Sequence, residues 1–185
     1  MKQFLIAGAA LVALAACSAS DAEVEVPLGA DATPAEIGAA FLKKNAKKSG
    51  VKTAESGLQY KVAQEGLENG AQAAPGQPIA AHYHGYFIDG EVFDSSYTRG
   101  QPLTGPSNGF IKGWNEALGE MKVCEARTLY INSDLAYGDN GRGGIPGGAT
   151  LLFNMQLLAV AGQSETEVFE CPAEKIFSGP EAYGE

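Results

Sequence analysis

Basic residues, cysteines and long apolar runs are all scarce in this sequence. Thirteen Lys and Arg stand against 22 Asp and Glu, which gives a formal net charge of −9. The basic residues form no run longer than the pairs Lys43-Lys44 and Lys47-Lys48. A chain with this charge is repelled by phosphate groups, which argues against a nucleic-acid partner. The apolar run from Phe4 to Ala16 is too short to span a bilayer as a stable helix.

Several motifs of covalent and metal chemistry are also missing. The Gly-rich stretch 138–144 is not followed by Gly-Lys-Ser or Gly-Lys-Thr, which argues against a phosphate-binding loop. Ser95 and Ser96 lie outside any Gly-x-Ser-x-Gly motif, so we interpret them as structural. His82 and His84 have a spacing that can bind a metal, but no Cys or carboxylate cluster accompanies them. We therefore expect two solvent-facing histidines, no metal site and no cofactor.

The first residues have the pattern of a signal peptide. Lys2 supplies a short positive region, and small residues end the apolar run before Cys17. Leu14-Ala15-Ala16-Cys17 resembles the lipobox of bacterial lipoproteins, in which the cysteine is acylated and becomes the new N-terminus. Several acyl chains on one residue anchor a protein stably. Because Ser18 rather than Asp follows, analogy with enteric bacteria favours the outer membrane, with the domain facing the periplasm. The alternative is ordinary secretion with a chance cysteine.

The cysteine count agrees with export. The chain has three cysteines, and lipid would use Cys17. Cys124 and Cys171 then remain as an even pair in an oxidising compartment. We predict a disulfide between them that ties the C-terminal extension to the domain. The alternative is two free buried thiols.

Residues 34–49 predict a short amphipathic helix. Thr33 is a good N-cap, Pro34 suits the first helical position, and Glu36 completes a capping box. Gly50 would end the helix. Its apolar face would comprise Ile37, Ala40 and Phe41.

From Gly57 onward the pattern changes to strands. Apolar and polar residues alternate over 58–62, 79–87, 127–132 and 150–160. Asp89-Gly90 indicates a two-residue hairpin turn, and apolar spacing over 111–121 indicates one short helix. This predicts an α+β domain: a curved antiparallel β-sheet wrapped around a short α-helix, with a short N-terminal helix. We divide the chain into a signal peptide (1–16), a lipidated tether (17–32), an N-terminal helical segment (33–56), the domain (57–160) and a C-terminal extension (161–185).

Five blocks of sequence follow one another between residues 81 and 158. They are Ala81-His82-Tyr83-His84-Gly85, Asp89-Gly90-Glu91-Val92-Phe93-Asp94-Ser95-Ser96, Phe110-Ile111-Lys112-Gly113-Trp114, Leu135-Ala136-Tyr137-Gly138, and Gly144-Ile145-Pro146 with Ala149-Thr150-Leu151-Leu152-Phe153. In this order they resemble the FKBP-type peptidyl-prolyl cis–trans isomerases. Gly57-Leu58-Gln59-Tyr60 is similar to the entry strand of bacterial members, including the macrophage infectivity potentiator group. The resemblance implies the FKBP fold and isomerisation of X-Pro bonds in exported proteins.

The resemblance also implies an apolar pocket that works without nucleophile, metal or cofactor. The implied catalytic residues are Tyr83, Phe93, Asp94, Trp114, Tyr137 and Phe153. The implied substrate-binding residues are Leu103, Phe110, Ile111 and Ile145. Expected partners are proline-containing unfolded or partly folded proteins, and macrolides such as rapamycin are candidate ligands.

This chain departs from the family pattern at four places. The stretch 103–113 is shorter and richer in Gly and Pro than usual. Leu103 stands where many members carry an aromatic residue, and Cys124 stands where glycine is common. The loop over the site reads Gly144-Ile145-Pro146-Gly147.

Two other classes of function stay open from the sequence. One is a binding module or holdase chaperone that keeps the pocket to hold proline-containing segments. The other is a small-ligand-binding barrel. The joint presence of Tyr83, Asp94, Trp114, Tyr137 and Phe153 favours the enzyme. The predicted N-terminal helix is much shorter than the dimerising helices of some relatives, so we expect a monomer.

Overall fold

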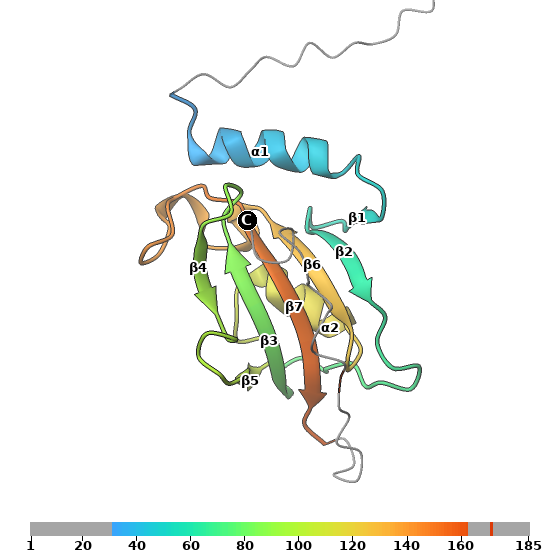
Figure 1. Cartoon of the computed structure of the whole chain (residues 1–185). Coiled ribbons are helices and arrows are strands. Elements are labelled where there is room, and N and C mark those ends of the chain that lie inside the picture. Colours follow the sequence, from blue (N-terminus) through green and yellow to red (C-terminus); the bar gives the residue numbers. More distant parts are fainter. Residues whose placement is uncertain (1–30, 163–170, 172–185) are drawn as a thin grey trace, which may run out of the picture.

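The computed structural model describes residues 31–162 and Cys171, and in this part of the chain seven strands form one antiparallel sheet. The strand order is β1-β2-β6-β7-β3-β4, and β5 pairs with β3 (Figure 1). The elements are α1 Pro34–Asn45, β1 Val51–Thr53, β2 Gln59–Gln64, β3 Pro78–Tyr86, β4 Val92–Ser95, β5 Leu103–Pro106, α2 Lys112–Glu120, β6 Ala126–Ile131, the 3-10 helices η1 Ser133–Leu135 and η2 Gly138–Asn140, and β7 Leu151–Val160. The predicted curved antiparallel sheet with a short helix on it is confirmed. No helix in the described ranges combines the length and the apolarity that a membrane crossing requires.

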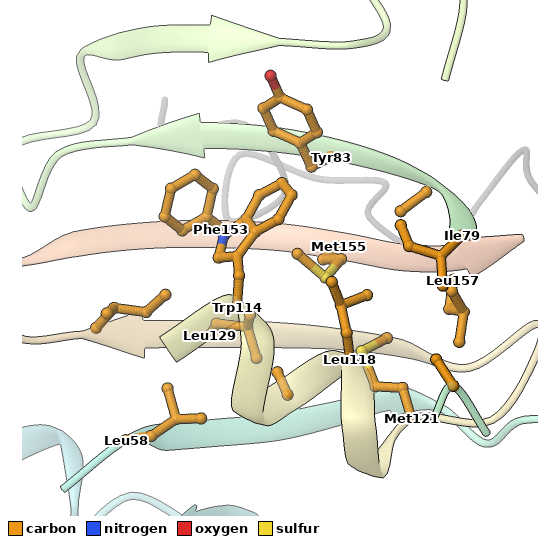
Figure 2. Packing of buried hydrophobic residues seen from close by; sticks show 14 of the residues in the cluster. Leu58, Ile79, Tyr83, Trp114, Leu118, Met121, Leu129, Phe153, Met155 and Leu157 are labelled. Atoms are coloured by element: carbon orange, nitrogen blue, oxygen red, sulfur yellow. The ribbon is translucent and has the colours of Figure 1, made fainter. Parts of the chain in front are cut away.

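The hydrophobic core lies between α2 and one face of the sheet (Figure 2). Trp114 and Leu118 of α2 are buried there, together with Met121, which caps the helix. The facing residues of β7 are Leu151, Phe153, Met155 and Leu157. Burial of one such side chain contributes about 1.5–3 kcal/mol. A one-residue slip of β7 would turn all four side chains away from α2, so their burial fixes the register of this strand in the sheet.

The other face of β7 is buried as well, and it is polar. Asn154 and Gln156 are fully buried, although simple alternation would expose them. Asn154 accepts a hydrogen bond from the Thr128 hydroxyl at 3.0 Å. On β3 the prediction of two solvent-facing histidines is wrong for His84, which is 7% exposed. The His82 ring instead stacks on Tyr97 with 4.6 Å between ring centres, and its Nδ1 lies 2.8 Å from the Ser96 hydroxyl.

The first helix begins as predicted. Thr33 and Glu36 form the capping box, and the hydrogen bond from the Thr33 N–H lowers the pKa of Glu36. Figure 1 shows α1 lying across the end of the sheet where β2 and β7 begin. The helix ends at Asn45, four residues before the predicted end, because the chain tightens there into 3-10-type turns.

The predicted apolar face of α1 is wrong at Ile37 but right at Phe41, which is partly buried and contacts Tyr130 with 6.0 Å between ring centres. Ile37 is 40% exposed, and the buried positions are Gly38 and Asn45. Asn45 donates a hydrogen bond to the Gln59 side chain at 3.0 Å, and Gln59 in turn donates to the Leu42 carbonyl at 3.0 Å. Besides the Phe41 contact, the helix is therefore held by polar contacts and by the close backbone approach at Gly38, and a search for apolar residues does not detect these two features.

Gly38→Val is expected to lower the free energy of unfolding by about 1–3 kcal/mol, because there is no room for a side chain between α1 and Thr150. A Cβ atom at Gly38 would lie 2.3 Å from the Thr150 hydroxyl and 3.1 Å from its Cβ. Urea denaturation followed by tryptophan fluorescence measures the change. Ala39→Val is the matched control, since Ala39 is exposed on the same helix. An equal loss in both variants would contradict this packing.

The hairpin between β3 and β4 has a longer loop than predicted. The Phe87 N–H donates to the Glu91 carbonyl at 2.9 Å, so three residues rather than two lie within the hydrogen bond that closes the turn. Gly90 takes the left-handed conformation with φ 92°, as a type I turn followed by a bulge requires. The register of the β3–β4 pair shifts between Gly85 and Tyr86, and this shift determines which residues of β4 lie opposite β3.

Cys124 and Cys171 are joined by a disulfide across 47 residues of sequence. Cys124 lies in the turn between α2 and β6 and has φ 67°, the left-handed region that favours glycine. This conformation explains why glycine is the common residue at the equivalent turn of the family that the sequence resembles. Cys17 lies outside the described residues.

Candidate functional site

A cavity of about 670 Å³, open on one side, lies between the sheet, α2 and the connections around them. Fifteen residues line it, and all ten residues named from the sequence are among them. They are Tyr83, Phe93, Asp94, Leu103, Phe110, Ile111, Trp114, Tyr137, Ile145 and Phe153. Sequence reasoning missed the other five, which are Gly109, Lys112, Ala136, Arg142 and Gly144.

The sheet and α2 supply the floor of the cavity. Tyr83 comes from β3, Phe153 from β7 and Trp114 from α2, and these three residues are each 4–5% exposed. The Trp114 ring meets Tyr83 at 4.9 Å and Phe153 at 5.1 Å between ring centres, both edge to face. Figure 2 shows the three rings converging from the two layers. Such edge-to-face pairs add about 0.5–1.5 kcal/mol each, so the floor is a rigid aromatic surface.

Two more rings extend this surface toward the rim. Phe93 of β4 contacts Phe153 with 5.5 Å between ring centres, and Phe110 contacts Trp114 at 5.5 Å. Both are only partly buried. A Cβ atom at Gly85 would lie 2.8 Å from ring atoms of both Phe93 and Phe153. A glycine in β3 is therefore what allows the two rings to lie this close to the strand.

Hydrogen bonds from Asn115 fix the segment that leads into α2. Its side-chain oxygen accepts from the Phe110 N–H at 3.0 Å. Its side-chain nitrogen donates to the carbonyls of Phe110 and Asn108, each at 3.2 Å. Ile111 is the N-cap of α2 and lines the cavity, so the helix N-terminus, with its partial positive charge, lies at the site.

One edge of the cavity carries a small polar network. The Tyr83 hydroxyl donates a hydrogen bond to Asp94, and Arg99 pairs with the other oxygen of the same carboxylate. Arg99 also donates to the Tyr83 hydroxyl at 2.8 Å. Arg99 was not predicted, because it reaches Asp94 across the turn after β4 and no sequence motif marks that contact. Burial, followed by the hydrogen bond to Asp94, raises the pKa of Tyr83 to about 12.

This shift predicts how Tyr83 affects stability at alkaline pH. The folded pKa of about 12 lies above the ordinary value of 10.0, so the contribution is complete below pH 10 and is lost as pH rises toward 12. We expect wild type to be more stable than Tyr83→Phe at about pH 9, and this difference to shrink toward about pH 11.5. Urea midpoints of both proteins across this range test it. A constant difference would show that the Tyr83 hydroxyl is not shielded as described.

The loop between β6 and β7 closes the remaining side. It carries Tyr137, Arg142 and Ile145 to the cavity. Arg142 and Ile145 exchange backbone hydrogen bonds of 3.0 Å each, which makes a tight local hairpin. The Arg142 guanidinium lies 6.0 Å from the centre of the Tyr137 ring. Leu103, from β5, also lines the cavity.

Ser95 and Ser96 are structural, as interpreted from the sequence. The Ser96 hydroxyl accepts from the Tyr83 N–H at 2.9 Å, and the Ser95 hydroxyl accepts from the Tyr97 N–H at 3.2 Å. Neither serine lines the cavity. These bonds instead hold β3 and the turn after β4 in the geometry that presents Tyr83 and Asp94.

Comparison with known proteins agrees with this geometry. The family model described as FKBP-type peptidyl-prolyl cis-trans isomerase matches residues 69–158. The model described as the domain amino terminal to that isomerase matches residues 17–62. A 22 kDa FKBP-type peptidyl-prolyl cis-trans isomerase of Escherichia coli is 47% identical over 124 residues, which make up 66% of this chain and 59% of that protein.

Two solved structures have the same fold. FkpA from Escherichia coli superimposes with a TM-score of 0.64 and 41% identity, over 67% of this chain and 57% of that chain. A peptidyl-prolyl cis-trans isomerase from Pseudomonas syringae gives a TM-score of 0.64 and 30% identity, over 71% of this chain and 98% of that chain. The chain spans about half the length of five curated bacterial relatives that it matches, from 45% to 59%. On these matches, this chain belongs to the FKBP-type peptidyl-prolyl cis-trans isomerase family.

Proposed function

We propose that this protein catalyses the cis–trans isomerisation of X-Pro peptide bonds in unfolded or partly folded exported proteins. The observation that carries the proposal is an open cavity with a floor of three packed aromatic rings and with Asp94 at one edge. Its shape suits a prolyl ring resting on Trp114 between Tyr83 and Phe153.

The physical task is rotation about an amide bond. The barrier is about 18–20 kcal/mol because resonance must be broken, while the cis and trans forms of X-Pro differ by only about 0.5–1 kcal/mol. The twisted amide of the transition state is less polar than the planar one. An apolar surface therefore destabilises the planar state relative to the twisted one, and catalysis is differential binding without covalent chemistry.

The edge groups would hold the substrate while the bond rotates. The Ile111 N–H, at the start of α2, and the Tyr137 hydroxyl would each donate a hydrogen bond to a substrate carbonyl. Asp94 is tied to Tyr83 and Arg99, so its carboxylate stays fixed at the cavity edge. We assign it the role of orienting the amide rather than transferring a proton.

An isomerisation assay on a proline-containing peptide tests this function. We expect the full chain to accelerate exchange above the uncatalysed rate, and rapamycin to suppress that acceleration. A wild-type protein that suppresses aggregation of an unfolded protein but gives no rate above background would favour the holdase instead.

The finer parts of the proposal concern location and assembly. Acylation at Cys17 and anchoring in the outer membrane rest on the lipobox-like sequence, and intact mass of the membrane fraction tests them. Packing of α1 on its own sheet through Gly38 and Asn45 supports a monomer, because the helix uses that face within the chain. Sedimentation of the chain without its lipid tests the assembly state.

A further inference from the structure

The mouth of the cavity carries an excess of positive charge. Three of the lining residues are charged: Asp94, Lys112 and Arg142. Asp94 is already paired with Arg99, which is not itself a lining residue. The lining therefore presents two cations that its one carboxylate does not offset. The protein as a whole has a formal net charge of −9, so this concentration of cations is local.

Both cations are available to a ligand. Lys112 and Arg142 are exposed. Within residues 31–162 and Cys171, the ion pairs that form involve Arg99 and Arg127. Lys112 and Arg142, which we call the rim cations, take part in none of them. Asp139 is on the same loop as Arg142 but is not among the residues that line the cavity.

Their positions relate them to the groups that would hold a substrate backbone. Lys112 is the first residue of α2 and directly follows Ile111. Arg142 lies over the Tyr137 ring. The two cations thus flank the two proposed carbonyl contacts, where the side chains next to a bound proline would lie.

We propose that Lys112 and Arg142 are specificity-determining residues, which favour X-Pro segments with an acidic side chain next to the proline. The inference rests on the proposed isomerase function and names the substrate class of that same site. Exposed charges at contact distance in water change binding by a factor of a few each. We expect about a tenfold preference for a Glu-Pro over a Lys-Pro peptide at low salt, with Gln-Pro between them.

The test uses matched peptides that differ only in Glu, Gln or Lys, placed either before or after the proline. A protease-free assay gives kcat/KM for each, at low salt and at about 0.5 M NaCl, where exposed charges are screened. The preference for Glu should fall to within about twofold in high salt. Equal kcat/KM for Glu and Lys at both positions would overturn the inference.

The variants assign the effect to the rim. The double variant Lys112→Gln and Arg142→Gln should reduce the Glu-to-Lys ratio to within about twofold at low salt. The control is Lys52→Gln with Lys61→Gln, which makes the same change in net charge at two exposed lysines outside the cavity lining. It should keep the preference. Loss of the preference in the control as well would show that net charge, not the rim, is responsible.

A binding measurement separates this inference from the isomerase proposal. Trp114 is the only tryptophan and lies on the cavity floor, so its fluorescence reports peptide binding without turnover. Tighter binding of the Glu peptide supports the inference even if no peptide is isomerised. Turnover of all three peptides with equal affinity supports the enzyme and contradicts the rim preference.

Discussion

Trp114→Ala is expected to lower kcat/KM for an X-Pro peptide by about tenfold to a hundredfold, the largest loss of any single site substitution. The indole forms the floor of the cavity and contacts Tyr83, Phe110 and Phe153. Its removal leaves the prolyl ring without a surface and lets water into the site, which weakens the differential binding that lowers the barrier. Tyr137→Phe should reduce kcat/KM less, because it removes one hydrogen bond at the rim and keeps the apolar floor.

Because Trp114 is also a core residue, stability must be separated from catalysis. Truncation of a buried tryptophan costs about 3–5 kcal/mol, which alone could depopulate the folded state. Leu118→Ala is the matched control: Leu118 is fully buried, one turn further along α2, and does not line the cavity. It should lose about 2–5 kcal/mol of stability and keep kcat/KM per folded molecule. Equal loss of activity in both variants, corrected for the folded fraction, would contradict the assignment of Trp114 to the site.

Removal of the disulfide is expected to lower the free energy of unfolding by about 4 kcal/mol. The bridge between Cys124 and Cys171 closes 47 residues, and loop entropy for that length gives this figure. Urea denaturation of Cys171→Ser, compared with wild type under oxidising conditions, measures it. An unchanged midpoint in the variant would show that the two thiols are not bridged in solution.

The backbone at Cys124 allows a sharper version of this experiment. Its φ of 67° is unfavourable for a residue with a Cβ atom, and the bridge holds it there. In the Cys171→Ser background, Cys124→Gly should therefore be more stable than Cys124→Ala by about 0.5–1 kcal/mol. The difference isolates the backbone contribution from that of the bridge. Equal stability would mean that the turn relaxes to a different conformation once the bridge is gone.

Apolar periodicity predicted the elements that bury one face in the core and expose the other. The strand at β2 and the helix α2 both follow from alternation or 3–4 spacing, because each puts its apolar side against the core. Alternation also located β7, but it did not indicate that Asn154 and Gln156 on the opposite face are as buried as their apolar neighbours. On α1 the apolar spacing was wrong for Ile37 and did not detect the buried contacts of Gly38 and Asn45. Polar burial depends on partners distant in sequence, which periodicity does not encode.

The short strands β1 and β5 and the residues that support the site could not be predicted from apolar periodicity either. Strands β1 and β5 are three and four residues long, too short for alternation to stand out. All ten site residues were named through family resemblance, and the structure places them around one cavity. Arg99 and Asn115 belong to none of the quoted sequence blocks and support those residues, so only their contacts identified them. Gly85 ends the first block, but only the structure shows that it makes room for Phe93 and Phe153.

Strand β7 pairs with β3 on one side and β6 on the other, and its first seven residues are all buried. Amide exchange should consequently be slowest there, since those N–H groups open only when the whole domain unfolds. Phe153 is therefore held on the least adaptable part of the molecule, whereas Arg142 and Ile145 belong to a connecting loop. Different substrate segments would therefore meet the same rigid surface at Phe153. Any adjustment of the site to a particular segment would come from the loop that carries Arg142 and Ile145.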